Sequence, residues 1–209
     1  MKEKFRNKYR IKTTRLPNWD YGWDGYYFIT ICTHNRINWF GEIVNGEMIL
    51  SDFGNIVKEE WNRSFEIRDE LTTGEFVIMP NHLHAIVIIK SVETYGRTSQ
   101  NHPSKTHDIE TNIHHDLKLD KTHVRASLQR KPKSLSSFVA GFKSATINAI
   151  DDSIDNNDTK TAKFNRYNQL WQPRYYDHII RNEEELNKIS QYITDNPINW
   201  KDDDLFFEG

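Results

Sequence analysis

The sequence predicts an α+β domain in which an antiparallel sheet carries helices packed on one of its faces. Two segments, residues 26–34 and 77–90, are rich in aromatic and β-branched residues, the composition of buried strands. Three others, residues 52–65, 134–150 and 183–195, repeat apolar residues at the spacing of an amphipathic helix. At 209 residues the chain is long enough for one domain with a substantial core.

The first elements follow from local signals. Residues 26–34 (YYFITICTH) predict a strand. Asn45 and Gly46 predict a two-residue hairpin turn, because both residues tolerate positive φ. The short strands that this turn joins are residues 42–44 and 47–50.

A helix and two strands come next. Ser51 or Asp52 caps the helix, whose apolar stripe ends at Phe65. The two strands are expected at residues 75–79 and 83–89. Together with the first strand they supply the centre of the predicted sheet.

The second half of the chain adds a helix, a strand and a helix. Ser134 begins the first of these helices. Residues 175–180 (YYDHII) predict a final edge strand introduced by Pro173. Asn182 caps the last helix, which stops before Pro197 because proline disfavours helix at the preceding residue.

Two histidines, His82 and His84, lie one residue apart in the apolar run VIMPNHLHAIVIIK. Alternate side chains of a strand share a face, so both imidazoles project from one side with Cβ atoms roughly 7 Å apart, close enough to bind one ion. Pro80 and Asn81 indicate a bulge or an edge just before the pair. The pair is a candidate metal site, and two structural histidines satisfied by hydrogen bonds are the alternative.

Composition narrows the class of protein. The chain has one cysteine, Cys32, which excludes an internal disulfide framework and a zinc site built from cysteines. No apolar run reaches membrane-spanning length, and the first residues lack the apolar core of a signal peptide. We therefore expect a cytoplasmic protein without a membrane partner.

Charge is unevenly distributed, although the net charge is only −2. Lysine and arginine crowd residues 1–18, a basic arm that can hold phosphates or be a solvated terminus.

Residues 91–131 show no periodicity and predict a flexible insertion. Its five histidines could bind zinc, but their spacing is irregular. Three further lysines, Lys131, Lys133 and Lys143, flank or lie on the helix that follows, so the basic entry of this helix offers a phosphate-binding end. An ordinary amphipathic core helix is the alternative.

Tyr192 and Asn196 lie four residues apart on the last predicted helix, so they share one face. If that face covers the histidine strand, Asn196 could complete a metal site and Tyr192 could hold its hydroxyl beside it. Packing at the rim of the core is the alternative for such a tyrosine.

Four segments of the chain resemble successive blocks of the single-tyrosine HUH transposases, especially the REP-associated tyrosine transposases of the IS200-like superfamily. These segments are FITICTHNR, VIMPNHLHAIVII, SLSSFVAGFKSAT and LWQPRYYDHIIRNEEELNKISQYITDNPINW. The resemblance spans most of the chain, but not the arm, the insertion or the acidic tail of residues 202–208.

This resemblance implies a ferredoxin-like sheet that carries His82 and His84 as ligands of a divalent cation, Mg²⁺ or Mn²⁺. It implies Tyr192 as the nucleophile and Asn196 as the third ligand. The substrate would be single-stranded DNA beside a hairpin, and DNA contacts are then expected from Lys131, Lys133 and Lys143. The chemistry would be cleavage through a 5′-phosphotyrosine followed by rejoining. The sequence is compatible with a monomer or a homodimer.

Two other functions fit the same residues. A metal-dependent hydrolase could use His82 and His84 with an acid such as Glu75, and a metal-bound water would then be the nucleophile. A catalytically silent regulator would bind hairpin DNA without cutting it. Tyr175 and Tyr176 are rival nucleophiles, which lack a partner at the spacing between Tyr192 and Asn196.

Overall fold

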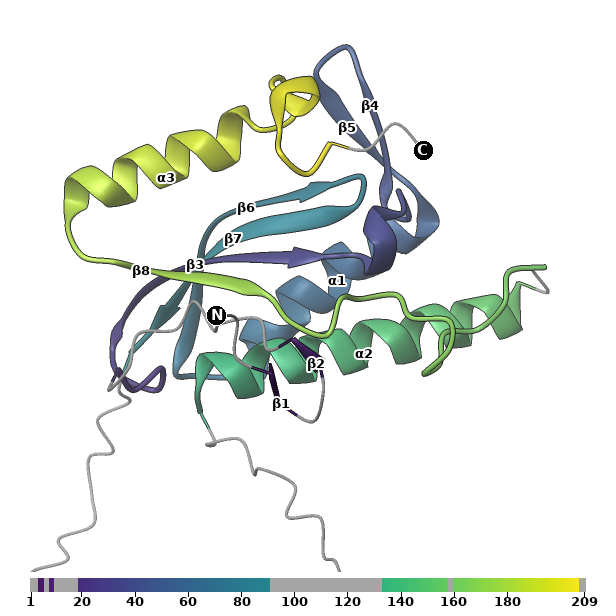
Figure 1. Cartoon of the computed structure of the whole chain (residues 1–209), viewed down its shortest axis with the longest axis horizontal. Coiled ribbons are helices and arrows are strands. Elements are labelled where there is room, and N and C mark those ends of the chain that lie inside the picture. The colour runs from purple at the N-terminus through teal and green to yellow at the C-terminus, as the bar shows by residue number, and fades with distance from the viewer. Residues whose placement is uncertain (1–3, 6–7, 10–18, 91–132, 158–159, 207–209) are drawn as a thin grey trace, which may run out of the picture.

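The computed structural model describes residues 4–5, 8–9, 19–90, 133–157 and 160–206. Its centre is a four-stranded antiparallel sheet in the order β6-β7-β3-β8 (Figure 1). The strands are β3 (Gly25–Cys32), β6 (Leu71–Met79), β7 (His82–Ile89) and β8 (Tyr176–Ile180). The helices that connect them are α1 (Asp52–Glu66) and α2 (Leu135–Asn156). This strand-helix-strand-strand-helix-strand order is ferredoxin-like, so the predicted α+β fold class is confirmed.

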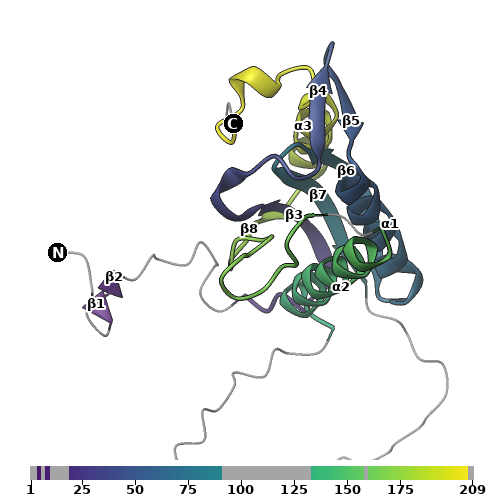
Figure 2. The same cartoon turned by 90° about the vertical axis from the view of Figure 1, so that its right-hand side faces the viewer.

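Helices α1 and α2 cover one face of the sheet and enclose the main core (Figure 2). Side chains alternate along β3, so Tyr27, Ile29 and Ile31 all point toward these helices and are fully buried. Trp61 of α1 meets Phe142 of α2 edge to face, with 5.4 Å between ring centroids. Aromatic burial of this kind dominates the stability of a core, which explains why the helix pair is held firmly on the sheet.

The third helix, α3 (Glu183–Asp195), lies on the opposite face, against β6 and β7 (Figure 1). Its residues Leu186, Ile189 and Ile193 join Phe28 and Ile86 in a second, smaller apolar cluster. The prediction that the helices share one face is therefore wrong for α3. The reason is that β7 carries apolar residues on both sides, so each of its faces needs a cover.

Pro80 and Asn81 form the turn between β6 and β7, in which the last residue of β6 pairs with His82. Pro80 forms no bulge, because the fixed φ of proline also suits a turn, but β6, the strand that it follows, is an edge strand of the sheet as predicted. The register shift lies earlier in β6, between Thr73 and Phe76. His82 is consequently the first residue of β7, next to a tight turn.

The remaining elements follow the predicted caps and turns. A hairpin of β4 (Gly41–Val44) and β5 (Glu47–Leu50) turns at Asn45 and Gly46, whose φ angles are 52° and 81°. Ser51 and Asn182 accept hydrogen bonds from the first turns of α1 and α3. Among the described elements no helix is long and apolar enough to cross a membrane.

The chain ends in a short 3-10 helix, η2 (Trp200–Asp202), and a segment that folds back toward α3. A second 3-10 turn, η1 (His34–Arg36), follows β3. Two short strands, β1 (Lys4–Phe5) and β2 (Lys8–Tyr9), pair within the predicted arm. The rest of the arm and the predicted insertion lie outside the described residues.

Candidate metal and nucleophile site

His82 and His84 stand side by side at the start of β7, on the face of the sheet that α3 covers. They are 0% and 3% exposed, and their ring centroids are 4.4 Å apart. Strand alternation brings both rings to one side, as the sequence predicts. Two imidazoles that are this close together and buried from solvent can offer their nitrogens to the same ion.

Nδ1 of each imidazole ring is within hydrogen-bond distance of a neighbouring side chain. His84 Nδ1 lies 2.8 Å from Thr30 Oγ1, on the adjacent strand. His82 Nδ1 donates to Asn81 Oδ1 at 2.9 Å, because the amide group of Asn81 donates elsewhere, to two backbone carbonyls. Within the described part of the chain, His82 Nε2 is buried and has no hydrogen-bond partner. A ring fixed through Nδ1 with a lone pair left on Nε2 is the usual arrangement of a metal-binding histidine.

Burial, assisted by the neighbouring His84, lowers the pKa of His82 to about 3. The folded protein therefore keeps His82 neutral while the unfolded chain takes up a proton below about pH 6.5. With a chelator present, we expect this difference in the protonation of His82 to lower the free energy of unfolding by about 3 kcal/mol as the pH falls from 6.5 to 4. Urea unfolding at several pH values would measure it, and His82→Gln should flatten the profile. Equal slopes in both proteins would contradict the prediction.

Tyr192 reaches the histidines from the last turns of α3. Its hydroxyl lies 3.1 Å from His84 Nε2 and donates to Asp203 Oδ2 at 3.3 Å. The side chain is 46% exposed, so one edge remains open to a ligand. Burial of the hydroxyl, with the negative charge of Asp203, raises the pKa of Tyr192 to about 12. The phenol is thus protonated at neutral pH and needs activation before it can act as a nucleophile.

Asn196 and Asp203 close the other side of the site. Asn196 is 2% exposed, and its Nδ2 donates to Asp203 Oδ2 at 2.8 Å. Asn196 Oδ1 is buried without a partner among the described residues. Burial alone would raise the pKa of Asp203, but the His84 ring, the Asn196 amide and the Leu205 N–H hold that pKa well below its usual range. Asp203 is therefore a carboxylate at neutral pH.

These residues form a donor set that fits a divalent cation. One atom each of His82, His84 and Asp203 lie within 4.8 Å of one another, the one such cluster of His, Cys, Asp or Glu in the described ranges. His82 Nε2 and Asn196 Oδ1 add two buried lone pairs that no hydrogen bond uses within those ranges. Imidazole with carboxylate and carboxamide oxygens suits Mn²⁺ and is compatible with Mg²⁺.

The sequence interpretation missed Asp203. It treats residues 202–208 only as an acidic tail, whereas the segment after η2 returns one of these carboxylates to the histidines. The signal in the sequence is three consecutive aspartates, residues 202–204, close behind Asn196. Their spacing does not reveal which of them enters the site, because that depends on the path of the chain through η2.

The three lysines predicted to contact DNA have different surroundings. Lys131 lies outside the described residues. Lys133 is exposed just before α2, with a positive φ of 54°. Lys143 points its ammonium at the chain before β8 and donates to the backbone carbonyls of Gln172 at 2.6 Å and Arg174 at 3.1 Å. Two of its three N–H groups are thus already engaged in holding this segment.

Methionine substitutions should separate the two described lysines. We expect Lys143→Met to lower the free energy of unfolding by about 1.5–3 kcal/mol, because two hydrogen bonds from a charged group are lost. Lys133→Met should leave stability unchanged, weaken binding of single-stranded DNA and reduce the salt slope of binding by about 1. Urea unfolding and fluorescence anisotropy at several salt concentrations would test both. Unchanged stability of Lys143→Met would contradict the structural role.

The other residues considered as a nucleophile or as a metal ligand lie away from the cluster of His82, His84 and Asp203, or do not make the contacts that this cluster makes. Tyr175 packs against the main core, and its hydroxyl lies 3.4 Å from Ser136 Oγ. Glu75, the acid considered for a hydrolase, accepts a hydrogen bond from Ser190 at 2.9 Å and is not part of the metal cluster. Tyr176 lies on the same face of the sheet as the histidines, one strand beyond Thr30. The five histidines of the insertion lie outside the described residues.

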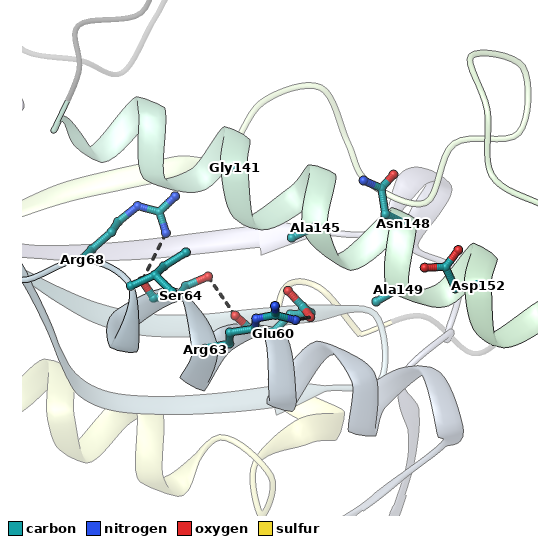
Figure 3. A pocket seen from close by; sticks show the side chains of 10 residues that line it. Glu60, Arg63, Ser64, Arg68, Gly141, Ala145, Asn148, Ala149 and Asp152 are labelled. Atoms are coloured by element: carbon teal, nitrogen blue, oxygen red, sulfur yellow. Dashed lines mark hydrogen bonds and ion pairs between the residues drawn. The ribbon is translucent and has the colours of Figure 1, made fainter.

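A pocket of about 390 Å³ lies between α1 and α2, away from the histidines (Figure 3). Gly141 leaves room in it for Arg68, since a Cβ at this position would lie 2.8 Å from the guanidinium. Arg68 donates to the Ser64 carbonyl at 3.1 Å, and Arg63 pairs with Glu60 at 3.7 Å. Two charged groups of this pocket, Arg63 and Glu60, thus pair with each other, and none of the lining residues belongs to the cluster around His82.

Comparisons with known proteins bear on the family and on the fold of the chain. No protein-family model matches the chain. An uncharacterized protein of Haemophilus influenzae is 33% identical over 199 residues, which cover 94% of this chain and 93% of that protein. Among solved structures, a REP-associated tyrosine transposase bound to a REP hairpin matches with a TM-score of 0.50 and 16% identity, over 91% of this chain and 74% of that chain.

Proposed function

Because the chain belongs to one family with the Haemophilus influenzae protein and has the fold of the REP-associated tyrosine transposase, we propose that it cleaves and rejoins single-stranded DNA with Tyr192 as nucleophile. The observation that carries this proposal is the Tyr192 hydroxyl, 3.1 Å from His84 Nε2 and beside the cluster of His82, His84 and Asp203 that could hold a metal ion. A tyrosine that only packed at the rim of the core would not need a hydroxyl directed at such a cluster.

The reaction is a transesterification. The Tyr192 oxygen attacks the phosphorus of a phosphodiester, and the bond from phosphorus to the 3′ oxygen breaks. The phenol gives up one proton, and the 3′ oxygen takes one up from solvent and leaves as a 3′-OH, so no net proton is gained or lost. Asp203 Oδ2, 3.3 Å from the Tyr192 hydroxyl, is placed to accept the phenolic proton. The product is a 5′-phosphotyrosine, and attack by another 3′-OH reverses the step and joins the strands. The number of phosphoester bonds is conserved, so no ATP is needed.

The donor set would hold Mg²⁺ or Mn²⁺ through His82 and His84, with Asn196, Asp203 or both supplying oxygen. When bound, the cation would polarise the phosphodiester and stabilise its developing negative charge. The protein's own part is to keep the ligands in place: Thr30 and Asn81 hold the rings, and burial keeps His82 unprotonated.

The substrate we propose is single-stranded DNA next to a hairpin. The structural neighbour was solved with a REP hairpin, and the same fold here carries an exposed lysine, Lys133, at the entry to α2. Phosphate contacts from lysines position a strand without reading its sequence.

The test is formation of a covalent adduct. The protein is incubated with hairpin oligonucleotides labelled at the 3′ end and Mg²⁺, Mn²⁺ or chelator, and the products are separated on a denaturing gel. We expect the labelled fragment on the 3′ side of the cut to migrate with the protein, in the presence of metal only. Metal-dependent cleavage without an adduct would favour a hydrolase, and binding without cleavage across many oligonucleotides would favour a silent regulator.

A further inference from the structure

The sheet face that carries the histidines is covered unevenly. Helix α3 packs on β6 and β7, while β8 forms the opposite edge of the sheet (Figure 1). On that edge Tyr176 projects to the histidine face, because it pairs with Thr30, whose hydroxyl contacts His84. The Tyr176 side chain is 45% exposed. A large aromatic ring therefore lies open to solvent on the face that holds the nucleophile.

The ring of Tyr176 is connected to the site through Phe28. Phe28 meets Tyr176 edge to face, with centroids 6.1 Å apart, and meets Tyr192 in the same way at 6.2 Å. Phe28 also stacks on His84, at 5.4 Å and an interplanar angle of 27°. One buried ring thus contacts the exposed tyrosine, the nucleophile and a metal-binding histidine. Tyr176 is held in a fixed position relative to the reacting groups.

The separation between Tyr176 and His84 suits a nucleotide next to the reacting phosphate. Strands of a sheet lie about 5 Å apart, and two strand spacings separate Tyr176 from His84, so their backbones are about 10 Å apart. A phosphodiester bound at Tyr192 would therefore bring an adjacent nucleotide of the same strand over β8. The Tyr176 ring is the exposed aromatic surface it would meet there.

Charge around β8 is compatible with a polyanion. Arg174 and Arg181 are both exposed and lie at the two ends of the strand. Asp177 is buried on the opposite face of the sheet, toward α2. The Glu185 carboxylate, which lies on this side, is already hydrogen-bonded to His178 and to the Arg181 N–H. Phosphates on either side of a base over Tyr176 would therefore meet arginines.

We propose that Tyr176 is a stacking platform for one nucleobase of single-stranded DNA next to the scissile phosphate. This inference rests on the proposed function and adds a substrate-binding residue to it. Stacking on an aromatic ring tolerates every base, because each base has a π face. The platform would thus position the strand at Tyr192 without selecting its sequence.

Binding of a short single-stranded oligonucleotide, measured by fluorescence anisotropy with chelator present, tests the platform independently of cleavage. We expect Tyr176→Ala to raise Kd about 5-fold to 150-fold, the loss that removal of one stacking ring corresponds to. Tyr176→Phe, which keeps the ring, should stay within about twofold of the unchanged protein. Tyr167→Ala is the matched control, because Tyr167 is 86% exposed on a loop after α2 and is not in contact with Phe28.

An abasic scan identifies the stacked base. Oligonucleotides with one base removed at successive positions should bind the unchanged protein more weakly at one position, and that position should make no difference to Tyr176→Ala. An unchanged Kd for Tyr176→Ala, or an equal loss in Tyr176→Phe, would overturn the platform while leaving Tyr192 chemistry intact. Failure of the unchanged protein to bind any single-stranded DNA would instead overturn the proposed function, and this inference with it.

Discussion

We expect the replacement of Tyr192 with phenylalanine to abolish the proposed covalent adduct with DNA and to lower the cleavage rate by about a thousandfold or more, because the proposed nucleophilic oxygen is lost. The ring contacts with Phe28 at 6.2 Å and with His84 at 5.2 Å remain, so the fold and DNA affinity should change little. Single-turnover cleavage of a hairpin oligonucleotide with Mn²⁺, followed on a denaturing gel, measures the effect.

Tyr175→Phe is the control for this experiment. It removes the hydroxyl of a neighbouring tyrosine that packs on the other face, so cleavage should continue at the rate of the unchanged protein. Cleavage that persisted in Tyr192→Phe would contradict the tyrosine mechanism and favour attack by a metal-bound water. Loss of the adduct in Tyr175→Phe would contradict the assignment of Tyr192 as the nucleophile.

Removing His82 should have the second large effect. We expect His82→Ala to weaken Mn²⁺ binding by about a hundredfold or more, since even residues that only orient a ligand contribute 10-fold to 100-fold. Cleavage should fall in parallel. Titration of free Mn²⁺ by electron paramagnetic resonance gives the affinity, and circular dichroism checks that the variant is folded. His178→Ala is the control: it removes a histidine that is hydrogen-bonded to Glu185, and it should bind Mn²⁺ with unchanged affinity.

The same titration distinguishes the two candidate oxygen ligands. Asp203→Asn should weaken Mn²⁺ binding about 10-fold to 100-fold if the carboxylate is a ligand, and Asn196→Ala should do so if the carboxamide is. Asp203→Asn should also lower the pKa of Tyr192, because the carboxylate charge raises it. Normal Mn²⁺ affinity in all three variants, His82→Ala included, would contradict a metal site in this cluster.

Much of the fold can be predicted because the signals are local. Asn45 and Gly46 form the predicted hairpin turn, and Ser51 and Asn182 cap the predicted helices, since each of these residues acts on its own backbone. The pairing of His82 with His84 on one face follows from strand alternation.

The sequence by itself thus determined the strands, the caps, the adjacent histidines and the one-turn spacing of Tyr192 from Asn196. Only the tertiary structure decided that α3 covers the face opposite α1 and α2, that Asp203 returns to the histidines, and that Lys143 turns to backbone carbonyls. These outcomes depend on which surfaces meet when distant segments pack. Periodicity reports the face that a side chain shares with its neighbours, and the packing of the whole chain decides what that face meets.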